Sequence, residues 1–373
     1  MKKIVALLFV CIFALATFAG CATSGSSPSE EDITIGVIFY SNDDALGSAV
    51  YATLNHAADA LGIELNWKIG DMDATSQITA AENLISAGCD GILCMPMSES
   101  ATSRIARLCN DNQVFYANCF RTITDESIKA EVEAYEYFVG CCYESEIDAA
   151  AHLVQLMADA GHQNYAVDYV PVGGALALRN VGFDQGIEIT GMNKLAEYMI
   201  ADNPDLNATI STIQNYINTY EELDVIFQGS AGMGQGEAII NTINSLAPGG
   251  EVQLATFDVF SGMKEAFEDG TLACAVGGIS PDALFTFIIL YNAVNGTPLS
   301  DQPEYLTQNY IFVTNAEEAD SYEQYIDNPN YMLYTAEDIR AMSKADNPDF
   351  SMDELRSIME DYTLENIMAK VAQ

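Results

Sequence analysis

The alternation of short apolar runs with helical stretches sets the fold of this chain. From residue 33 to residue 313, apolar runs of strand length are separated by stretches in which apolar side chains recur at helical spacing. The predicted strands cover residues 33–40, 63–69, 90–95, 114–118, 137–139, 165–170, 195–200, 224–228, 252–257, 272–276 and 305–313. The predicted helices cover residues 45–61, 75–87, 98–109, 147–160, 175–187, 208–219, 235–246, 262–268 and 281–295. This order is typical of parallel sheets, and its two consecutive sets predict an α/β protein of two doubly wound lobes.

Size and charge restrict the function classes. The chain has 373 residues, of which 49% are hydrophobic, so it can bury a substantial core in two domains or one bilobal unit. Its 54 acidic and 14 basic residues give a net charge of −40. Nothing in such a chain neutralises phosphates, so a duplex nucleic acid is excluded as a partner. An anionic lipid surface would repel the body, and the charge predicts a well-solvated surface.

The N-terminus has the features of an export signal. Lys2 and Lys3 precede the apolar residues 4–18, a run too short to span a bilayer comfortably. Ala19 and Gly20 then precede Cys21, which resembles the bacterial lipoprotein signal, where a peptidase cleaves before a cysteine that carries lipid. The sequence therefore predicts a signal peptide over residues 1–20, lipid attachment at Cys21, a flexible tether over residues 21–32, and an extracytoplasmic body. The alternative is an ordinary secretory signal with a chance cysteine.

The sequence predicts no catalytic residues, metal site or cofactor. The three histidines fall in separate elements, and neither a Cys-x-x-Cys pair nor a Gly-x-Ser-x-Gly motif occurs. Beyond Cys21, the remaining cysteines are Cys89, Cys94, Cys109, Cys119, Cys141, Cys142 and Cys274. An odd number cannot all pair within one chain, and their disulfide state stays open.

A glycine-rich stretch follows one predicted strand and opens the next helix. Residues 227–236 read Phe-Gln-Gly-Ser-Ala-Gly-Met-Gly-Gln-Gly, with the spacing Gly-x-Gly-x-Gly from Gly232 rather than that of a dinucleotide loop. Glu237 would also repel a phosphate at the start of that helix. The stretch therefore predicts a close-packed turn where a ligand can approach the backbone.

Several short segments together resemble a known family. They are Ile35-Gly-Val-Ile-Phe-Tyr, residues 81–93, Arg179-Asn-Val-Gly-Phe, residues 223–227 and Ala255-Thr-Phe-Asp. Their order resembles the type I periplasmic binding proteins, especially the ribose-binding-like lipoproteins of ABC importers, from about residue 33 to residue 313.

The resemblance implies two lobes joined by three hinge crossings. These fall near residues 138–140, 277–278 and 306–309. The expected lobes are residues 33–138 plus 279–307, and residues 139–278 plus 308–373. Short helices in the acidic tail are expected to pack along the second lobe.

The resemblance also implies which residues meet the ligand. The candidates are Tyr40, Asn42, Asp43, Asn118, Arg121, Arg179, Ser230 and Asp258. Asn118 stands where the family usually has an Asp-Arg pair, with Arg121 as the substitute guanidinium, and Ser230 replaces an Asn-Asp. Arg179 is either a ligand contact or a structural residue, and Asp258 either accepts ligand hydroxyls or caps the next helix. Candidates for stacking on a ligand ring are Tyr40, Phe120, Tyr143 and Phe260, whereas Trp67 is expected in the core.

The expected function is that of an extracytoplasmic, lipid-anchored solute-binding protein that delivers a small polar ligand to an ABC permease. Sugars are the first ligand class, and the glycine pattern also resembles the nucleoside-binding lipoproteins. Two further classes stay open: a ligand-sensing module for a membrane receptor, and an enzyme without a recognisable motif.

Overall fold

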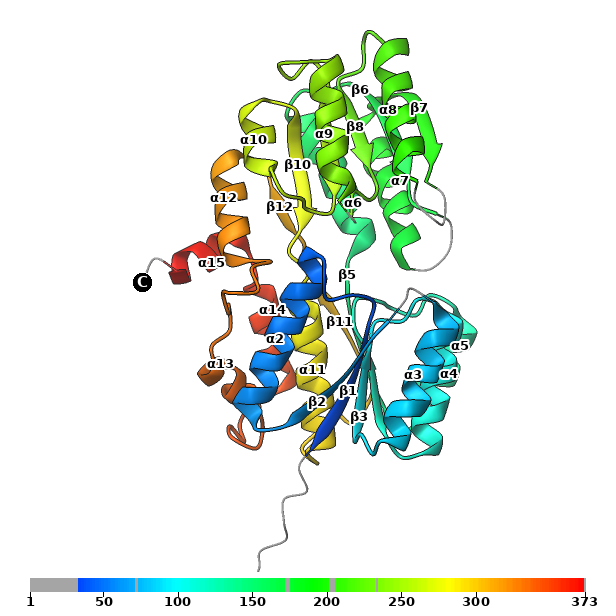
Figure 1. Cartoon of the computed structure of the whole chain (residues 1–373), viewed down its shortest axis with the longest axis vertical. Helices are drawn as coiled ribbons and strands as arrows, with labels where there is room; N and C mark the ends of the chain where they lie inside the picture. The colour runs from blue at the N-terminus through cyan, green and yellow to red at the C-terminus, as the bar shows by residue number, and fades with distance from the viewer. Residues whose placement is uncertain (1–32, 71–72, 172–174, 201–204, 233, 372–373) are drawn as a thin grey trace, which may run out of the picture. The chain divides into compact units, whose positions relative to one another are not determined.

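Two six-stranded sheets form the body of the protein (Figure 1). The computed structural model describes residues 33–70, 73–171, 175–200, 205–232 and 234–371. The signal peptide, Cys21 and the tether lie outside the described residues. Apart from one antiparallel pair, every strand pairing is parallel, which confirms the predicted two-lobed α/β class.

The first sheet has the strand order β11-β5-β4-β3-β1-β2. Its strands are β1 (Thr34–Phe39), β2 (Glu64–Ile69), β3 (Gly91–Cys94), β4 (Phe115–Asn118), β5 (Phe138–Glu144) and β11 (Glu304–Gln308). Its helices are α2 (Ala45–Leu61), α3 (Ala74–Ser86), α4 (Glu99–Asp111), α5 (Glu126–Glu133) and α11 (Pro281–Val294). Helices α3, α4 and α5 cover one face and α2 and α11 the other, and each face has its own apolar core. Thirteen consecutive residues of α11 are buried, so this helix is the centre of the first lobe.

The second sheet has the order β12-β10-β9-β8-β6-β7. Its strands are β6 (Asn164–Tyr169), β7 (Asn193–Met199), β8 (Val225–Gln228), β9 (Gln253–Phe257), β10 (Leu272–Gly277) and β12 (Ile311–Val313). Its helices are α6 (Glu146–Asp159), the 3-10 turn η1 (Ala175–Ala177), α7 (Leu178–Thr190), α8 (Leu206–Thr219), α9 (Gln235–Leu246) and α10 (Met263–Glu268). Helices α6 and α7 pack on one face, and α8, α9 and α10 on the other.

Three chain crossings join the two sheets. They lie between β5 and α6, between β10 and α11, and between β11 and β12. The first crossing lies after residue 144, later than expected, because all of β5 pairs with β4 and β11 in the first sheet. Cys141 and Cys142 on this strand are fully buried, so their burial holds it in that sheet.

Four helices follow the last strand. They are α12 (Ala316–Tyr325), α13 (Ala336–Ala341), α14 (Met352–Glu360) and α15 (Leu364–Val371). Capping boxes begin α13 and α14, with Thr335 paired to Asp338 and Ser351 paired to Glu354. Helix α12 packs on α10 of the second lobe, but α13 packs on α2 of the first lobe (Figure 1). The tail therefore does not follow the second lobe throughout, because the apolar sides of α13 and α14 are buried in the first-lobe core.

Candidate functional site

The predicted ligand residues stand where parallel strands end. Tyr40 follows β1, Asn118 ends β4, and Arg121 lies three residues beyond it. In the second lobe, Ser230 follows β8 and Asp258 follows β9. Because the carboxyl ends of parallel strands share one sheet edge, each lobe gathers its own candidates at one edge.

Electrostatics connects the two edges. Burial and a hydrogen bond to Asp44 raise the pKa of the Tyr40 hydroxyl, the negative charge of Asp258 raises that pKa further, and the positive charge of Arg121 opposes the shift. The Tyr40 hydroxyl donates to Asp44 Oδ2 at 2.6 Å. The charge of Asp258 in the second lobe therefore contributes to the pKa of Tyr40 in the first lobe.

Asp258 holds the glycine-rich turn. Its Oδ2 accepts from Ser230 Oγ at 2.7 Å, from the Gly232 backbone at 3.0 Å and from the Ala231 backbone at 3.2 Å. Asp258 has φ +72°, a conformation that is rare outside glycine and concentrates at functional sites. Helix α10 instead begins after Gly262 without a side-chain cap, so Asp258 does not cap it.

Phe120, two residues beyond β4, also has a left-handed backbone, with φ +59°. Its N–H donates to Asp282 Oδ1 at 2.7 Å, and its carbonyl accepts from Arg121 at 2.7 Å. The Phe120 ring is buried, 5.7 Å from the Phe39 ring, so it packs in the core rather than offering a face to a ligand. These bonds fix the turn that presents Arg121.

Arg179 is fully engaged by protein groups. It donates to Glu146 Oε2 at 2.7 Å, to the Gly229 carbonyl at 2.9 Å and to the Tyr310 hydroxyl at 2.9 Å. Its guanidinium also lies 4.3 Å from the centroid of the Phe257 ring. Burial has the largest single effect and lowers the pKa of Arg179, but the charges of Glu146, Tyr310 and Asp258 and the hydrogen bond to Glu146 together outweigh burial and raise that pKa well above its ordinary value. These contacts favour the structural role of Arg179, which positions the carbonyl of Gly229 in the glycine-rich turn.

The remaining predicted residues differ in exposure. Asn42 is half-buried and Asp43 is exposed on the loop before α2. Tyr143 is half-buried on β5, and Phe260 packs beside Gly236, where an added Cβ would lie 2.3 Å from its ring. Trp67 packs against Tyr51 at 4.7 Å and donates to Asn55, so its packing role is confirmed.

A group of buried polar side chains lies at the same edge of the first sheet and was not predicted. Glu144 ends β5, Gln308 ends β11 and Asp282 opens α11, all at most 3% exposed. Within the described residues, Glu144 Oε1, Asp282 Oδ2, Gln308 Oε1 and both amide atoms of Asn118 have no hydrogen-bond partner. Burial raises the pKa of Asp282 to about 7 and that of Glu144 well above its ordinary value. Buried polar atoms without protein partners are expected to bind water or ligand.

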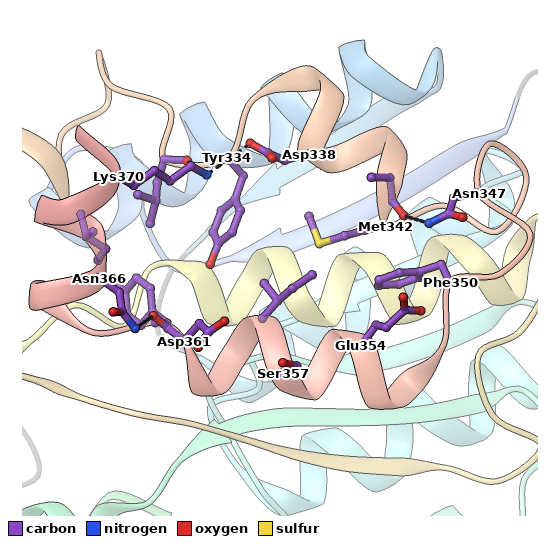
Figure 2. Close-up of a pocket in the computed structure, with 15 residues that line it drawn as sticks. Tyr334, Asp338, Met342, Asn347, Phe350, Glu354, Ser357, Asp361, Asn366 and Lys370 are labelled. Carbon is purple, nitrogen blue, oxygen red and sulfur yellow. Dashed lines mark hydrogen bonds and ion pairs between the residues drawn. The ribbon is translucent and has the colours of Figure 1, made fainter. Parts of the chain in front are cut away.

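A cavity lies elsewhere, in the C-terminal segment (Figure 2). It has a volume of about 530 Å³ and lies between α13, α14 and α15, with Tyr334 and Phe350 on its wall. It includes none of the predicted ligand residues. The predicted ligand residues lie at the strand ends of the two sheets instead.

The described residues show no group of three His, Cys, Asp or Glu side chains arranged to hold a metal ion. All seven cysteines beyond the tether are buried and unpaired, and burial raises the pKa of each thiol. Their packing is that of small apolar side chains. In the part of the chain that the structure covers, no helix is both long and apolar enough to cross a membrane.

The fold and the polar edges define a two-lobed binding protein. Residues 35–288 match the family described as periplasmic binding protein domain, and the chain belongs to this family. The predicted family resemblance is thereby confirmed. None of the curated proteins matches the chain.

Solved structures share the fold. A solute-binding protein of an ABC transporter from Bacillus halodurans, with bound myo-inositol, is 20% identical with a TM-score of 0.63. The match covers 80% of this chain and 99% of that one. A periplasmic ribose ABC transporter protein from Conexibacter woesei is 14% identical with a TM-score of 0.64, over 81% of this chain and 97% of that one. Both structures are covered almost entirely, while about a fifth of this chain stays unmatched, more than residues 1–32 account for.

Proposed function

We propose that this protein is the extracytoplasmic solute-binding lipoprotein of an ABC importer. It binds a small polar solute of the sugar class between its lobes and performs no bond chemistry. The observation that carries the proposal is that polar side chains stand at the strand ends of both sheets, with Tyr40 and Arg121 in the first lobe and Asp258 in the second. A ligand that contacts both lobes selects the arrangement in which they close.

The polar groups suit a ligand that is rich in hydroxyls. Asp258, Glu144 and Gln308 supply acceptor oxygens, and Arg121 and Asn118 supply donors. The hydroxyl groups of a ligand can donate to these acceptor oxygens and accept from these donors. The names of the similar structures, which bind myo-inositol, D-allose and L-arabinofuranose, support the same class.

The lipid anchor and the importer are part of the proposal. Cys21 follows the small residues Ala19 and Gly20 at the end of the apolar run, and its lipid would hold the protein at the membrane surface. The permease of the importer would then take the ligand from the closed lobes.

A ligand screen tests the proposed class. The melting temperature is measured with myo-inositol, D-ribose, D-allose, L-arabinose, adenosine and inosine, because a bound ligand stabilises the folded state by mass action. We expect one of the four polyols to raise the melting temperature. A rise with the nucleosides alone would replace the sugar class with the nucleoside class, and no rise with any compound would contradict both.

The Asp258→Asn variant tests the site itself. Loss of a charged hydrogen bond costs roughly 1.5–3 kcal/mol, so the affinity for the active polyol should fall about ten- to a hundredfold. Asp224→Asn is the matched control. Asp224 also accepts two backbone N–H groups at 2.8 Å, but from Gln163 and Asn164 at the opposite end of the same sheet. If calorimetry gives the two variants equal affinities for the active polyol, the polyol does not contact Asp258.

A further inference from the structure

The C-terminal segment, residues 316–371, is anchored in both lobes. Ala319 and Tyr322 of α12 are buried in the core of the second lobe. Ile339 of α13 and Leu355 of α14 are fully buried in the core of the first lobe. Ile367 of α15 then returns to the core of the second lobe. The segment therefore crosses between the lobes twice, in addition to the three crossings of the body.

The segment also contacts the middle crossing directly. The Tyr322 hydroxyl accepts the backbone N–H of Gly278 at 2.6 Å and donates to Asp327. Gly278 lies between β10 and α11 and has φ +77°, in the region that favours glycine. Its carbonyl accepts from Gln308 Nε2 at 3.2 Å, at the end of β11. Both polar groups of Gly278 are therefore held, one by the C-terminal segment and one by the strand that leads into the third crossing.

We propose that the C-terminal segment is a strap across the hinge, and that Tyr322 and Asp327 are the positioning residues through which it sets the balance between open and closed lobes. The proposal rests on the proposed function in that this balance sets ligand affinity. Hinge motion is absorbed by a few residues at element ends, and Gly278 is such a residue. A bond to its N–H therefore favours one backbone arrangement of the crossing over others.

The cavity in the segment fits this role. It lies between α13 and α14, which are fixed to the first lobe, and α15, which is fixed to the second, lines one end of it (Figure 2). Across it, Lys370 of α15 lies 3.4 Å from Asp338 Oδ2 of α13 and 5.6 Å from the centroid of the Tyr334 ring. A junction packed this loosely lets α15 shift relative to α13 without the loss of a close-packed core.

The test compares two buried tyrosines of the same segment. Tyr322→Phe removes the hydroxyl that holds Gly278. Tyr362→Phe is the matched control, because Tyr362 is 2% exposed in the same core and its hydroxyl has no partner among the described residues. Spin labels are placed at Ser86→Cys in α3 and Ser211→Cys in α8, one exposed position in each lobe. The seven native cysteines beyond residue 32 are buried, and Cys11 and Cys21 are changed to Ala in every variant, so the introduced thiols react first.

The interlobe distance distribution is measured on the full chain without ligand. A hydrogen bond contributes about 0.5–1.5 kcal/mol, so Tyr322→Phe should change the ratio of the lobe arrangements roughly two- to tenfold. Asp327→Asn should shift the distribution in the same direction, and Tyr362→Phe should leave it unchanged. Identical distributions for Tyr322→Phe and the unmodified chain would overturn the proposal, as would an equal shift in Tyr362→Phe. Because no ligand is needed, this result is independent of the polyol screen.

Discussion

Asp168 is a buried carboxyl group that is not among the predicted ligand residues. It lies on β6 with no exposed surface, and its Oδ1 accepts from the Tyr216 hydroxyl at 2.8 Å. Its Oδ2 has no partner among the described residues. Burial raises the pKa of Asp168 to about 7, although the bond from Tyr216 acts in the opposite direction. The native state therefore keeps a proton that the unfolded chain releases at lower pH.

This proton makes stability depend on pH. The unfolded chain binds fewer protons at this site between its ordinary pKa and about 7, so the contribution of Asp168 to the free energy of unfolding falls as pH rises through that window. In the unmodified chain, this contribution to the free energy of unfolding should fall by an amount on the order of a few kcal/mol between pH 4.5 and pH 8. Asp168→Asn should abolish that fall. Urea unfolding across this range measures it. Asp59→Asn, at an exposed position, is the control, and parallel pH profiles for Asp168→Asn and the unmodified chain would contradict the assignment.

The sequence predicted the residues at strand ends better than those at the crossings. Tyr40, Ser230 and Asp258 follow recognisable apolar strands, so their place at a sheet edge could be inferred. Glu144 and Asp282 could not be, because their burial depends on which sheet receives β5 and α11, and no local pattern encodes that choice. Arg179 matched a family motif, but the sequence could not decide between its two roles, because its partners Glu146 and Tyr310 come from distant elements.

At the scale of elements, helices α6 and α7 approach each other very closely. A Cβ added at Gly182 of α7 would lie 2.3 Å from the Ile147 carbonyl and 2.7 Å from the Ala150 side chain. Such distances cannot be accommodated without moving the helices. The small residues Gly182 and Ala150 therefore set the packing that also brings Arg179 to Glu146.

Gly182→Ala tests this packing. Overpacking a close interface typically costs about 1–3 kcal/mol, which exceeds the gain of roughly 0.5–1 kcal/mol from replacing glycine inside a helix. We expect a net loss of stability in urea unfolding. Gly70→Ala is the control, because no atom lies within 4 Å of the added Cβ. Unchanged or increased stability of Gly182→Ala would show that the helices separate at little cost.

Most elements were predicted from periodicity, and the exceptions have physical causes. Residues 305–313 were expected as one extended segment, but they form β11 and β12 in different sheets, because the third crossing interrupts the run. Helix α5 was missed since its eight residues bury only Val132 and present almost no apolar face. The path of α13 and α14 depends on a first-lobe core that the tail sequence does not reveal.

For the whole molecule, the anchor is the prediction with the largest effect. Cys21→Ala should release the protein from the membrane fraction into the medium, because the lipid would be its only hold on the membrane. Cys11→Ala, a change within the apolar run, is the control and should leave the protein attached. Fractionation followed by a carbonate wash measures both. A Cys21→Ala protein that stays with the membrane would contradict lipid attachment at this residue.

The strand order has a consequence for synthesis. A chain made from its N-terminus produces β1 to β5 first, but their sheet lacks α11 and β11 until residue 308 has been made. The second sheet lacks β12 until residue 313. The sheet that is begun first is therefore completed only five residues before the other sheet. A ribosome-bound chain cut off before residue 281 would carry the first-lobe strands β1 to β5 without their central helix. Such a fragment exposes apolar sheet surface, so nearly the whole chain must be available before either half can bury its core.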